Sequence, residues 1–374
     1  MNIAIPTILS TKKIVGVAEY LRNLVSNLQK IDTQNEYYII TFPQNRYLFN
    51  IIKENFHEIV IPVRDDSRAL LRLNYYFWQS LNFKKILNKY KIDIVHFPCP
   101  WFIPQNVTSI VTVHDLVETK YNKYGFFNNY FKNKIIENTI RNSDAIISVS
   151  KNTKMDIKST YHKDSQLVLN GPPTKYQTDE NIENNILVNY GIKKNRYFIF
   201  IGTLLRHKNI INQISAFKLF YEKNKNMKFL IVGKRDNAYS AIQKAIKKSN
   251  LENYVILAGY VDDLIKNTLL LNSNCLMYVS HYEGFGFPIL DAQHLSIPVI
   301  TSETSSMPEI AGKGALFVNP NNINQISNAM EQVVNNDNLR SSLIHNGIEN
   351  INRFSWKRCA EETIRVYNKL FDKS

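Results

Sequence analysis

Short apolar runs alternate along the first half of the chain with longer segments in which apolar residues recur every three or four positions. The short runs predict buried strands, and the longer segments predict amphipathic helices. Alternation of this kind is typical of a doubly wound parallel sheet. The predicted strands are Ile3–Ile5, Tyr37–Phe42, Ile59–Pro62, Ile92–Phe97, Ser109–His114, Ala145–Val149 and Leu167–Leu169, with helices at roughly 16–31, 69–88, 124–141 and 151–159.

The alternation breaks at Asn170-Gly-Pro-Pro173, and the chain stays polar to about Asn189, which we interpret as a hinge between domains. A second alternation then begins. The predicted fold class is therefore α/β, with two doubly wound Rossmann-like domains, at 1–175 and 190–353, and a last amphipathic helix at 354–374. Strands of the second half are predicted at Tyr197–Ile201, Phe229–Val232, Tyr254–Leu257, Cys275–Val279, Pro298–Thr301 and Leu316–Val318, and helices near 209–225, 236–249, 263–273, 288–296, 322–335 and 337–351.

One turn of the second half combines two glycines with two acidic residues, in Tyr282-Glu-Gly-Phe-Gly-Phe-Pro-Ile-Leu-Asp291. A strand-like run precedes it and a helical pattern follows it, with Pro288 near the helix start, so backbone amides of the turn can point at an anion. Glu283 and Asp291 bracket the turn, and carboxylates accept hydrogen bonds from pairs of hydroxyls. The pattern predicts a sugar hydroxyl on Glu283, a ribose on Asp291 and phosphates on the amides between them. An ordinary turn with solvated acids is the alternative.

A second turn, Gly202-Thr-Leu-Leu-Arg-His-Lys208, follows the first strand of the second half. Two cations before a helix N-terminus are electrostatically unfavourable unless an anion lies there. Arg206 can bond a phosphate bidentately, and Lys208 adds a point charge. We interpret the turn as a pyrophosphate site and expect the Lys208 side chain to be exposed while the site is empty. Solvated charges at a helix end are the alternative.

Two strand ends of the first half carry further candidates. Gly16 opens a helix after the first strand, where it either approaches a phosphate or simply starts the helix. His114 ends a strongly apolar strand, and ligands of doubly wound sheets gather at the carboxyl ends of strands. A lone histidine is more often structural than functional, so both roles stay open for His114.

Together these motifs resemble the retaining glycosyltransferases of the GT-B fold, specifically glycosyltransferase family 4. The family signature is an acid, Gly-Phe-Gly, a Pro-containing segment and a second acid, usually Glu; Asp291 stands here, one methylene shorter. The resemblance covers nearly the whole chain and is densest over 197–320. It implies two domains that face a cleft, with the acceptor on the first and the nucleotide sugar on the second. It also implies that the helix at 354–374 crosses back to the first domain.

The resemblance implies roles for individual residues as well. His114 would hold a hydroxyl of the donor sugar or help orient the acceptor, and Arg206 and Lys208 would stabilise the leaving pyrophosphate. The segment Ser302–Glu309 would close the donor side, and the acceptor would attack from the front without an obligatory enzyme nucleophile. No Asp-x-Asp-like motif stands at a strand end, so neither a metal nor a cofactor is expected. The catalytic candidates are His114, Arg206, Lys208 and Glu283, and the donor-binding candidates are Gly16, Gly202, Tyr260, Val261, Phe285, Gly286, Phe287 and Asp291, with the backbone near Tyr260 and Val261 reading the base.

The implied function is transfer of a hexose to a growing bacterial cell-surface polysaccharide such as O-antigen, lipopolysaccharide or capsule. Ser302–Glu309 resembles the corresponding segment of mannosyl- and rhamnosyltransferases, which favours GDP-mannose as the donor. Within the same fold, a UDP- or dTDP-sugar transferase and a nucleotide-sugar epimerase are alternatives. A hydrolase that uses Glu283 and Asp291 as its carboxylate pair and a non-catalytic binding protein are the others.

Composition and charge indicate the setting. With 46 basic and 32 acidic residues, the net charge of +14 favours anionic partners. Basic and aromatic residues interleave in Lys120–Lys134, which suits an anionic membrane surface or a lipid-linked acceptor, or else a helix packed on the core. No nucleic-acid motif accompanies this stretch. Because the chain shows three dispersed cysteines, no signal-peptide pattern and no membrane-spanning apolar stretch, we expect a cytoplasmic protein that attaches peripherally to the plasma membrane.

Overall fold

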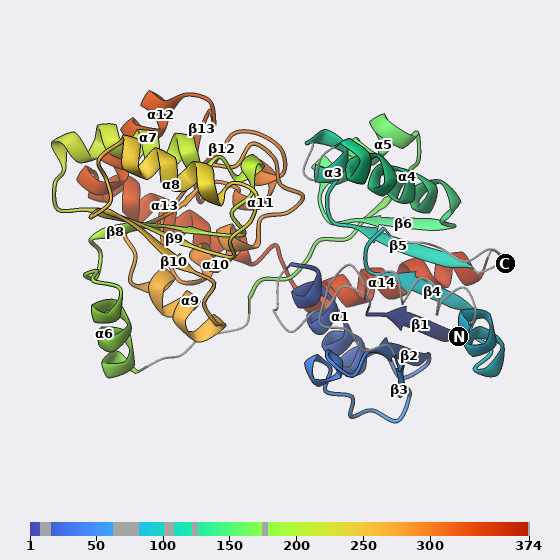
Figure 1. Cartoon of the computed structure of the whole chain (residues 1–374). Helices are drawn as coiled ribbons and strands as arrows, with labels where there is room; N and C mark the ends of the chain where they lie inside the picture. The colour runs from blue at the N-terminus through green and yellow to red at the C-terminus, as the bar shows by residue number, and fades with distance from the viewer. Residues whose placement is uncertain (8–15, 63–81, 101–107, 122–125, 174–178, 373–374) are drawn as a thin grey trace. The chain divides into compact units, whose positions relative to one another are not determined.

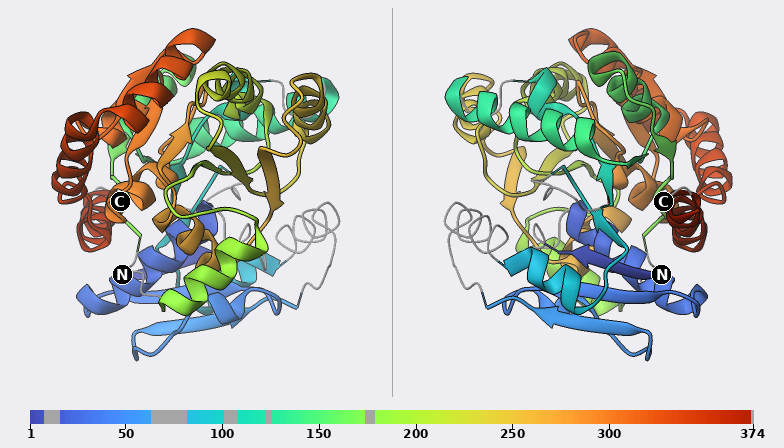
Figure 2. Two further views of the ribbon diagram at one scale, coloured as in Figure 1. Left: turned by 90° about the vertical axis from the view of Figure 1, so that its left-hand side faces the viewer. Right: turned by 90° about the vertical axis from the view of Figure 1, so that its right-hand side faces the viewer.

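The computed structural model describes residues 1–7, 16–62, 82–100, 108–121, 126–173 and 179–372. These residues form two compact units, one of residues 1–171 with 355–374 and one of residues 172–354 (Figure 1). Both units are α/β, as the two alternations predicted. The chain ends belong to the first unit (Figure 2). Most of the helix predicted at 69–88 lies outside the described residues, and its last part, 82–89, is helical.

The first unit contains a seven-stranded parallel sheet with the order β3-β2-β1-β4-β5-β6-β7. The strand order reverses between β1 and β4, which is the switch point of a Rossmann-like sheet. Both β1 and β5 are buried along nearly their whole length, which accounts for their continuous apolar runs. The strands are β1 Asn2–Pro6, β2 Glu36–Thr41, β3 Phe56–Val60, β4 Ile94–Phe97, β5 Ser109–Val113, β6 Ala145–Ser148 and β7 Gln166–Leu167.

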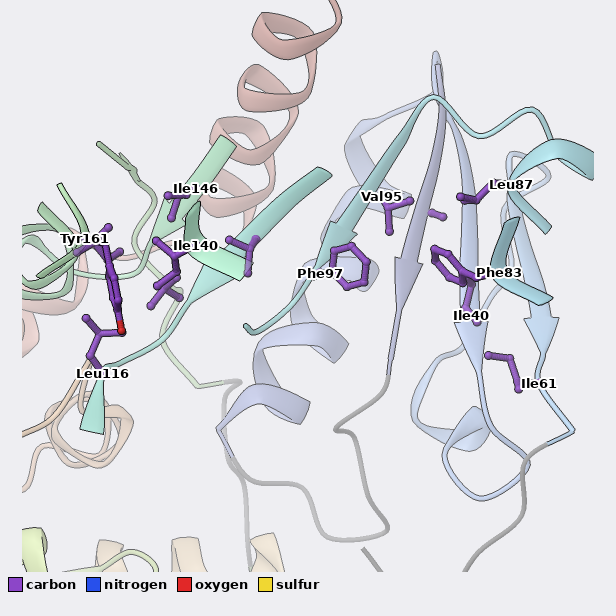
Figure 3. Packing of buried hydrophobic residues seen from close by; sticks show 14 of the residues in the cluster. Ile40, Ile61, Phe83, Leu87, Val95, Phe97, Leu116, Ile140, Ile146 and Tyr161 are labelled. Carbon is purple, nitrogen blue, oxygen red and sulfur yellow. The ribbon is translucent and has the colours of Figure 1, made fainter. Parts of the chain in front are cut away.

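Buried apolar side chains from these strands and from neighbouring helices form one core cluster (Figure 3). Phe97 and Phe83 lie with their ring centroids 6.4 Å apart, and both are fully buried. Leu116, Ile140 and Tyr161 belong to the same cluster. The cluster therefore joins the sheet to the helices that follow β5 and β6.

The helices of the first unit include the C-terminal one. Helix α14 packs along α1, so the last helix belongs to the unit that the chain leaves at Gly171. A side chain at Gly171 would place its Cβ 2.4 Å from the Trp356 backbone nitrogen, so the close approach of these two segments requires glycine. The helical segments are α1 Val17–Ile31, η1 Arg46–Leu48, α3 Val117–Lys120, α4 Phe126–Asn142, α5 Lys151–Tyr161 and α14 Trp356–Phe371.

The second unit contains a six-stranded parallel sheet with the order β10-β9-β8-β11-β12-β13. Helices α7, α8 and α12 cover one face, and α10 and α13 cover the other (Figure 1). The strands are β8 Tyr197–Ile201, β9 Lys228–Val232, β10 Val255–Gly259, β11 Cys275–Tyr278, β12 Val299–Ser302 and β13 Leu316–Val318. The helices are η2 Arg206–Lys208, α7 Ile210–Lys223, α8 Tyr239–Lys248, α9 Asp263–Leu271, α10 Phe287–His294, α11 Met307–Ala311, α12 Ile323–Asn335 and α13 Asp337–Ile351.

The polar segment interpreted as a hinge to Asn189 differs from that prediction. It contains helix α6, Glu180–Asn189, which packs on α9. Asp179 caps the helix by accepting a hydrogen bond from the Asn181 amide at 2.8 Å, and Leu187 is buried. A polar helix that buries few apolar side chains shows little periodicity in its sequence. The segment with its acidic residues was therefore interpreted as a linker.

Candidate functional site

The glycine turn between β11 and α10 has the strand–turn–helix geometry that the sequence predicted. Gly286 precedes the first residue of α10 and has φ +112°, and Pro288 is the second residue of the helix. A Cβ at Gly286 would also lie 3.2 Å from the Ile289 side chain. Only glycine adopts this conformation without strain, so the backbone of the turn requires glycine at position 286.

Two serines of the loop after β12 hold this turn. The Ser305 hydroxyl donates to the Glu283 carbonyl at 2.6 Å and accepts from the Glu283 amide at 3.1 Å. The Ser306 hydroxyl lies 2.9 Å from the carbonyls of both Glu283 and Phe285. Phe285 itself is buried against Phe354. From the sequence, Ser302–Glu309 was assigned only to the donor side. The hydrogen bonds from this segment to the turn were missed, because serines at these positions form no recognisable motif.

Lys208 and Glu283 form a nearly buried ion pair in the second unit. The Lys208 ammonium lies 2.6 and 2.8 Å from the two carboxylate oxygens and 3.1 Å from the Tyr278 hydroxyl. The side chains of Lys208 and Glu283 are only 12% and 10% exposed. The expectation that Lys208 is exposed was therefore wrong. The sequence did not show that the fold brings the Glu283 carboxylate into contact with the Lys208 ammonium.

The pair controls the charge of both groups. Burial raises the pKa of Glu283, but the neighbouring Lys208 outweighs it, and the pKa ends below its usual range. Burial lowers the pKa of Lys208, and the attraction of Glu283 and the Tyr278 hydroxyl brings it above its usual range. Both residues are therefore charged at neutral pH, and Tyr278 is a member of the cluster that sequence reasoning missed.

The turn after β8 presents its basic residues differently. Arg206 is exposed, and its amide donates to Asn237 Oδ1 at 3.2 Å, whereas His207 is 8% exposed. Gly202 directly follows β8, and its amide donates to the Val232 carbonyl at 2.9 Å. Arg206 and Lys208 thus remain the two candidate phosphate ligands of this turn, one exposed and one already paired.

Asn209 anchors the same turn and was not assigned a role from the sequence. Its backbone has φ +57°, which asparagine tolerates better than most residues. Its side-chain amide donates to the Val279 carbonyl at 3.1 Å and to the Pro320 carbonyl at 2.7 Å. Asn209 therefore ties the start of α7 to the strand that leads into the glycine turn.

Asp291 lies on the second turn of α10 and is also nearly buried. Its nearest described charge is the Lys266 ammonium of α9, 3.5 Å from Oδ2. Burial raises the pKa of Asp291 above its usual range, and the attraction of Lys266 opposes that shift. Lys266 was not singled out from the sequence, although its place one turn into the helix after Asp262 could have suggested it.

The segment expected to seat the base lies directly before α9. Tyr260 is 41% exposed, and Val261 is half-buried. Asp262 caps α9 by accepting from the Ile265 amide at 2.9 Å. The cap fixes the start of α9 directly after Val261, and the readout of a base by the backbone near Tyr260 and Val261 stays a prediction.

His114 and Gly16 belong to the first unit. His114 Nε2 lies 2.8 Å from the Pro98 carbonyl, which can only accept, so this nitrogen carries the proton and Nδ1 keeps its lone pair. Burial lowers the His114 pKa to about 4, which keeps the ring neutral. The Tyr20 ring meets His114 edge-on, with centroids 4.8 Å apart. Gly16 caps α1 with φ +38°, and a Cβ there would meet no atom within 4 Å.

The predicted membrane stretch is described in part. Lys134 pairs with Glu137 at 3.2 Å, Lys120 pairs with Asp156, and Tyr130 is 55% exposed. Residues 122–125 and the side chains of Phe126, Phe127 and Phe131 lie outside the described residues. Within the described part of the chain, no helix is long and apolar enough to cross a membrane, and no His, Cys, Asp and Glu side chains gather in a group that could hold a metal.

Comparison with known proteins agrees with this geometry. Residues 14–175 match the family described as Glycosyltransferase Family 4, and residues 183–350 match Glycosyl transferases group 1. O-antigen chain mannosyltransferase B of Escherichia coli is 30% identical to this chain over 186 residues. The match covers 50% of this chain and 49% of that protein, so it spans about half the length of the relative. O-antigen chain mannosyltransferase RfbU of Salmonella typhimurium is 26% identical over 71% of each chain. Sucrose-phosphate synthase from Thermosynechococcus elongatus has the same fold, with a TM-score of 0.77, 18% identity and 100% coverage of both chains.

Proposed function

Because this chain is a glycosyltransferase of family 4 with the GT-B fold, we propose that it moves a hexose from a nucleotide sugar to a growing cell-surface polysaccharide, with retention of configuration. The observation that carries the proposal is the Lys208–Glu283 pair beside the glycine turn. A cation, exposed Arg206 and the amides of a helix start are the groups that stabilise a leaving diphosphate. O-antigen, lipopolysaccharide and capsule are the proposed products.

The pair also favours front-side attack over an enzyme nucleophile. Both Glu283 oxygens accept hydrogen bonds from Lys208, which lowers their nucleophilicity. In the proposed step the acceptor hydroxyl oxygen bonds to the anomeric carbon, the bond from that carbon to the diphosphate breaks, and the hydroxyl proton passes to the departing phosphate oxygen. On the first unit, His114 Nδ1 is the proposed acceptor of a sugar hydroxyl. The hydrolase alternative is disfavoured, because Glu283 bound to Lys208 is a poor general acid.

GDP-mannose is the proposed donor. Two relatives, at 30% and 26% identity, are named O-antigen chain mannosyltransferases, which supports mannose over other hexoses. Thermal unfolding with GDP-, UDP-, dTDP- and ADP-sugars, followed by transfer assays with the sugar that stabilises most, tests both donor and class. NMR of the new linkage tests retention. Release of nucleotide without any acceptor would instead indicate an epimerase, and glycan cleavage without nucleotide would indicate a hydrolase.

A lipid-linked or oligosaccharide acceptor is the proposed second substrate, and the cytoplasmic face of the plasma membrane is the proposed location. Exposed Tyr130 and the lysines of Lys120–Lys134 support contact with anionic headgroups. The pairing of Lys134 with Glu137 offsets part of that charge. No metal or cofactor is proposed for the transfer, because Lys208 and Arg206 supply positive charge at the turn.

A further inference from the structure

The Asp291 carboxylate has an unusual environment for a nearly buried charge. Its side chain is 10% exposed, and the Lys266 ammonium lies 3.5 Å from Oδ2. Charge-assisted hydrogen bonds are shorter, at about 2.7–2.9 Å. A buried carboxylate needs good hydrogen-bond donors to offset the loss of its hydration. The environment of Asp291 in the described chain therefore suits a ligand that brings hydroxyl donors.

Lys266 is held beside Asp291 from its own helix. Asp263, one turn earlier on α9, places Oδ1 3.2 Å from the Lys266 ammonium, and the Lys266 side chain is 20% exposed. These two ionic contacts of the ammonium, at 3.2 and 3.5 Å, are longer than a strong hydrogen bond. An oxygen that enters between Lys266 and Asp291 would thus improve the hydrogen bonding of both charges at once.

A ribose diol matches such a pair of opposite charges. Each hydroxyl donates one hydrogen bond and also accepts, so the same hydroxyl can donate to Asp291 and accept from Lys266. Location agrees with this match, because α9 begins directly after the exposed Tyr260 that is expected to lie at the base. Asp291 is also one methylene shorter than the usual Glu of this family, and Lys266 brings a second polar group from the neighbouring helix.

We propose that Lys266 is a specificity-determining residue that binds the ribose hydroxyls of the donor nucleotide together with Asp291. The pair would select ribonucleoside diphosphates over analogues that lack the bound hydroxyl. If that hydroxyl is the 2′ one, the pair also selects GDP- or UDP-sugars over dTDP-sugars. This inference rests on the proposed function, because it assigns a ligand group to the donor site. It adds a residue and a discrimination that the glycine turn alone does not provide.

Calorimetric titration of the full chain tests the proposal with GDP, 2′-deoxy-GDP and 3′-deoxy-GDP, and with the corresponding uridine nucleotides. The proteins are the wild type, Lys266→Met and the control Lys223→Met, which removes an exposed lysine that pairs with Glu331 at 2.8 Å. A hydrogen bond to a charged group corresponds to about tenfold in affinity. We expect the wild type to bind at least one deoxy analogue about tenfold more weakly than the ribonucleotide.

In Lys266→Met the ribonucleotide should lose about tenfold in affinity while that deoxy analogue loses little, so the preference shrinks. The Lys223→Met control should bind as the wild type does. Equal loss for the ribonucleotide and both deoxy analogues would overturn the inference, since Lys266 would then only balance the Asp291 charge. A wild type that binds all three equally also overturns it, whereas a wild type that binds no nucleotide overturns the proposed function itself. Lys266→Gln measures the same coupling if Lys266→Met does not fold.

Discussion

The Lys208 ammonium donates hydrogen bonds to both oxygens of the Glu283 carboxylate, at 2.6 and 2.8 Å. A third bond, at 3.1 Å, goes to the Tyr278 hydroxyl, so the residue that should neutralise a diphosphate is already paired. An incoming diphosphate must therefore compete with Glu283 for the same charge. This relationship predicts two roles for Lys208, one in folding and one in transfer, that substitutions can separate.

Lys208→Ala should lower the turnover number by about 10²-fold or more, the scale of a lost transition-state charge contact. It should also destabilise the protein by about 3–5 kcal/mol, because Glu283 is left buried without its partner. Steady-state kinetics and denaturant unfolding measure the two effects. The matched control is the double variant Lys208→Met with Glu283→Gln, which should regain most of the stability and none of the activity. Wild-type turnover in Lys208→Ala would contradict the catalytic role.

The same pair predicts a pH dependence of stability. The pKa of Glu283 is lowered, so its contribution is complete above the ordinary value of 4.5 and disappears as the pH falls through the depressed value. The pKa of Lys208 is raised, so its contribution is complete below 10.5 and disappears as the pH rises through the elevated value. The stability difference between wild type and the double variant should be constant between these limits and shrink in acid. A difference that grows in acid would contradict the pairing.

His114 should remain neutral, with its proton on Nε2, at every pH well above about 4. Nitrogen NMR of the labelled ring reads the tautomer directly. If Nδ1 accepts a sugar hydroxyl, His114→Asn, which keeps an acceptor near Nδ1, should retain more activity than His114→Gln, by about tenfold. Higher activity of His114→Gln, or a proton on Nδ1, would refute this assignment.

Tyr367 should stabilise the first unit through a buried polar chain. Its hydroxyl lies 2.6 Å from His96 Nδ1, and His96 Nε2 lies 2.8 Å from the Thr112 hydroxyl. Tyr367→Phe leaves a buried ring nitrogen without its partner, which should cost about 1–3 kcal/mol in unfolding free energy. Tyr47→Phe is the control, because Tyr47 is 62% exposed. Its unfolding free energy should stay within about 0.5 kcal/mol of the wild-type value. Equal unfolding free energies of the two variants would show that the hydrogen bond from Tyr367 to His96 does not stabilise the first unit.

Much of the fold was predictable, because buried parallel strands appear in the sequence as continuous apolar runs. The run before Glu283 predicted β11, and the two glycines predicted the turn, in which the positive φ of Gly286 requires glycine. Helix α6 was missed because a helix that rests on one neighbour needs few apolar residues. Local pattern therefore finds strands and turns such as β11 and the glycine turn, but it does not find a polar helix such as α6.

The details of the candidate site were less predictable, because they depend on which residues meet across the sheet. Glu283 and Lys208 are 75 residues apart and yet form one ion pair. Ser305 and Lys266 likewise act on residues of the glycine turn and of α10 from other elements. No spacing rule connects such pairs, and a hydroxyl or a single lysine is common in any sequence. The roles of the individual site residues therefore stay predictions that the experiments above test.

The stretch Lys120–Lys134 offers the last prediction, which concerns membranes. Each lysine near an anionic surface contributes about 1 kcal/mol to binding, and salt screens this contribution. Replacing Lys120, Lys123, Lys132 and Lys134 with Gln should therefore weaken binding to anionic vesicles by at most about 4 kcal/mol. The loss should be smaller than this limit, because Lys134 and Lys120 already pair with Glu137 and Asp156.

Vesicle sedimentation at low and high salt measures the effect, with neutral vesicles as the lipid control. Lys244, Lys247 and Lys248 of α8 provide a matched protein control, because they form a basic cluster on the second unit. Their replacement with Gln should leave vesicle binding nearly unchanged if the contact is specific to Lys120–Lys134. Activity on a short soluble acceptor should survive in both variants, since neither set belongs to the glycine turn. Losses in proportion to the four and three lysines removed would indicate a general effect of the +14 net charge. Unchanged binding in both variants would leave the lysines of Lys120–Lys134 as an ordinary solvated face.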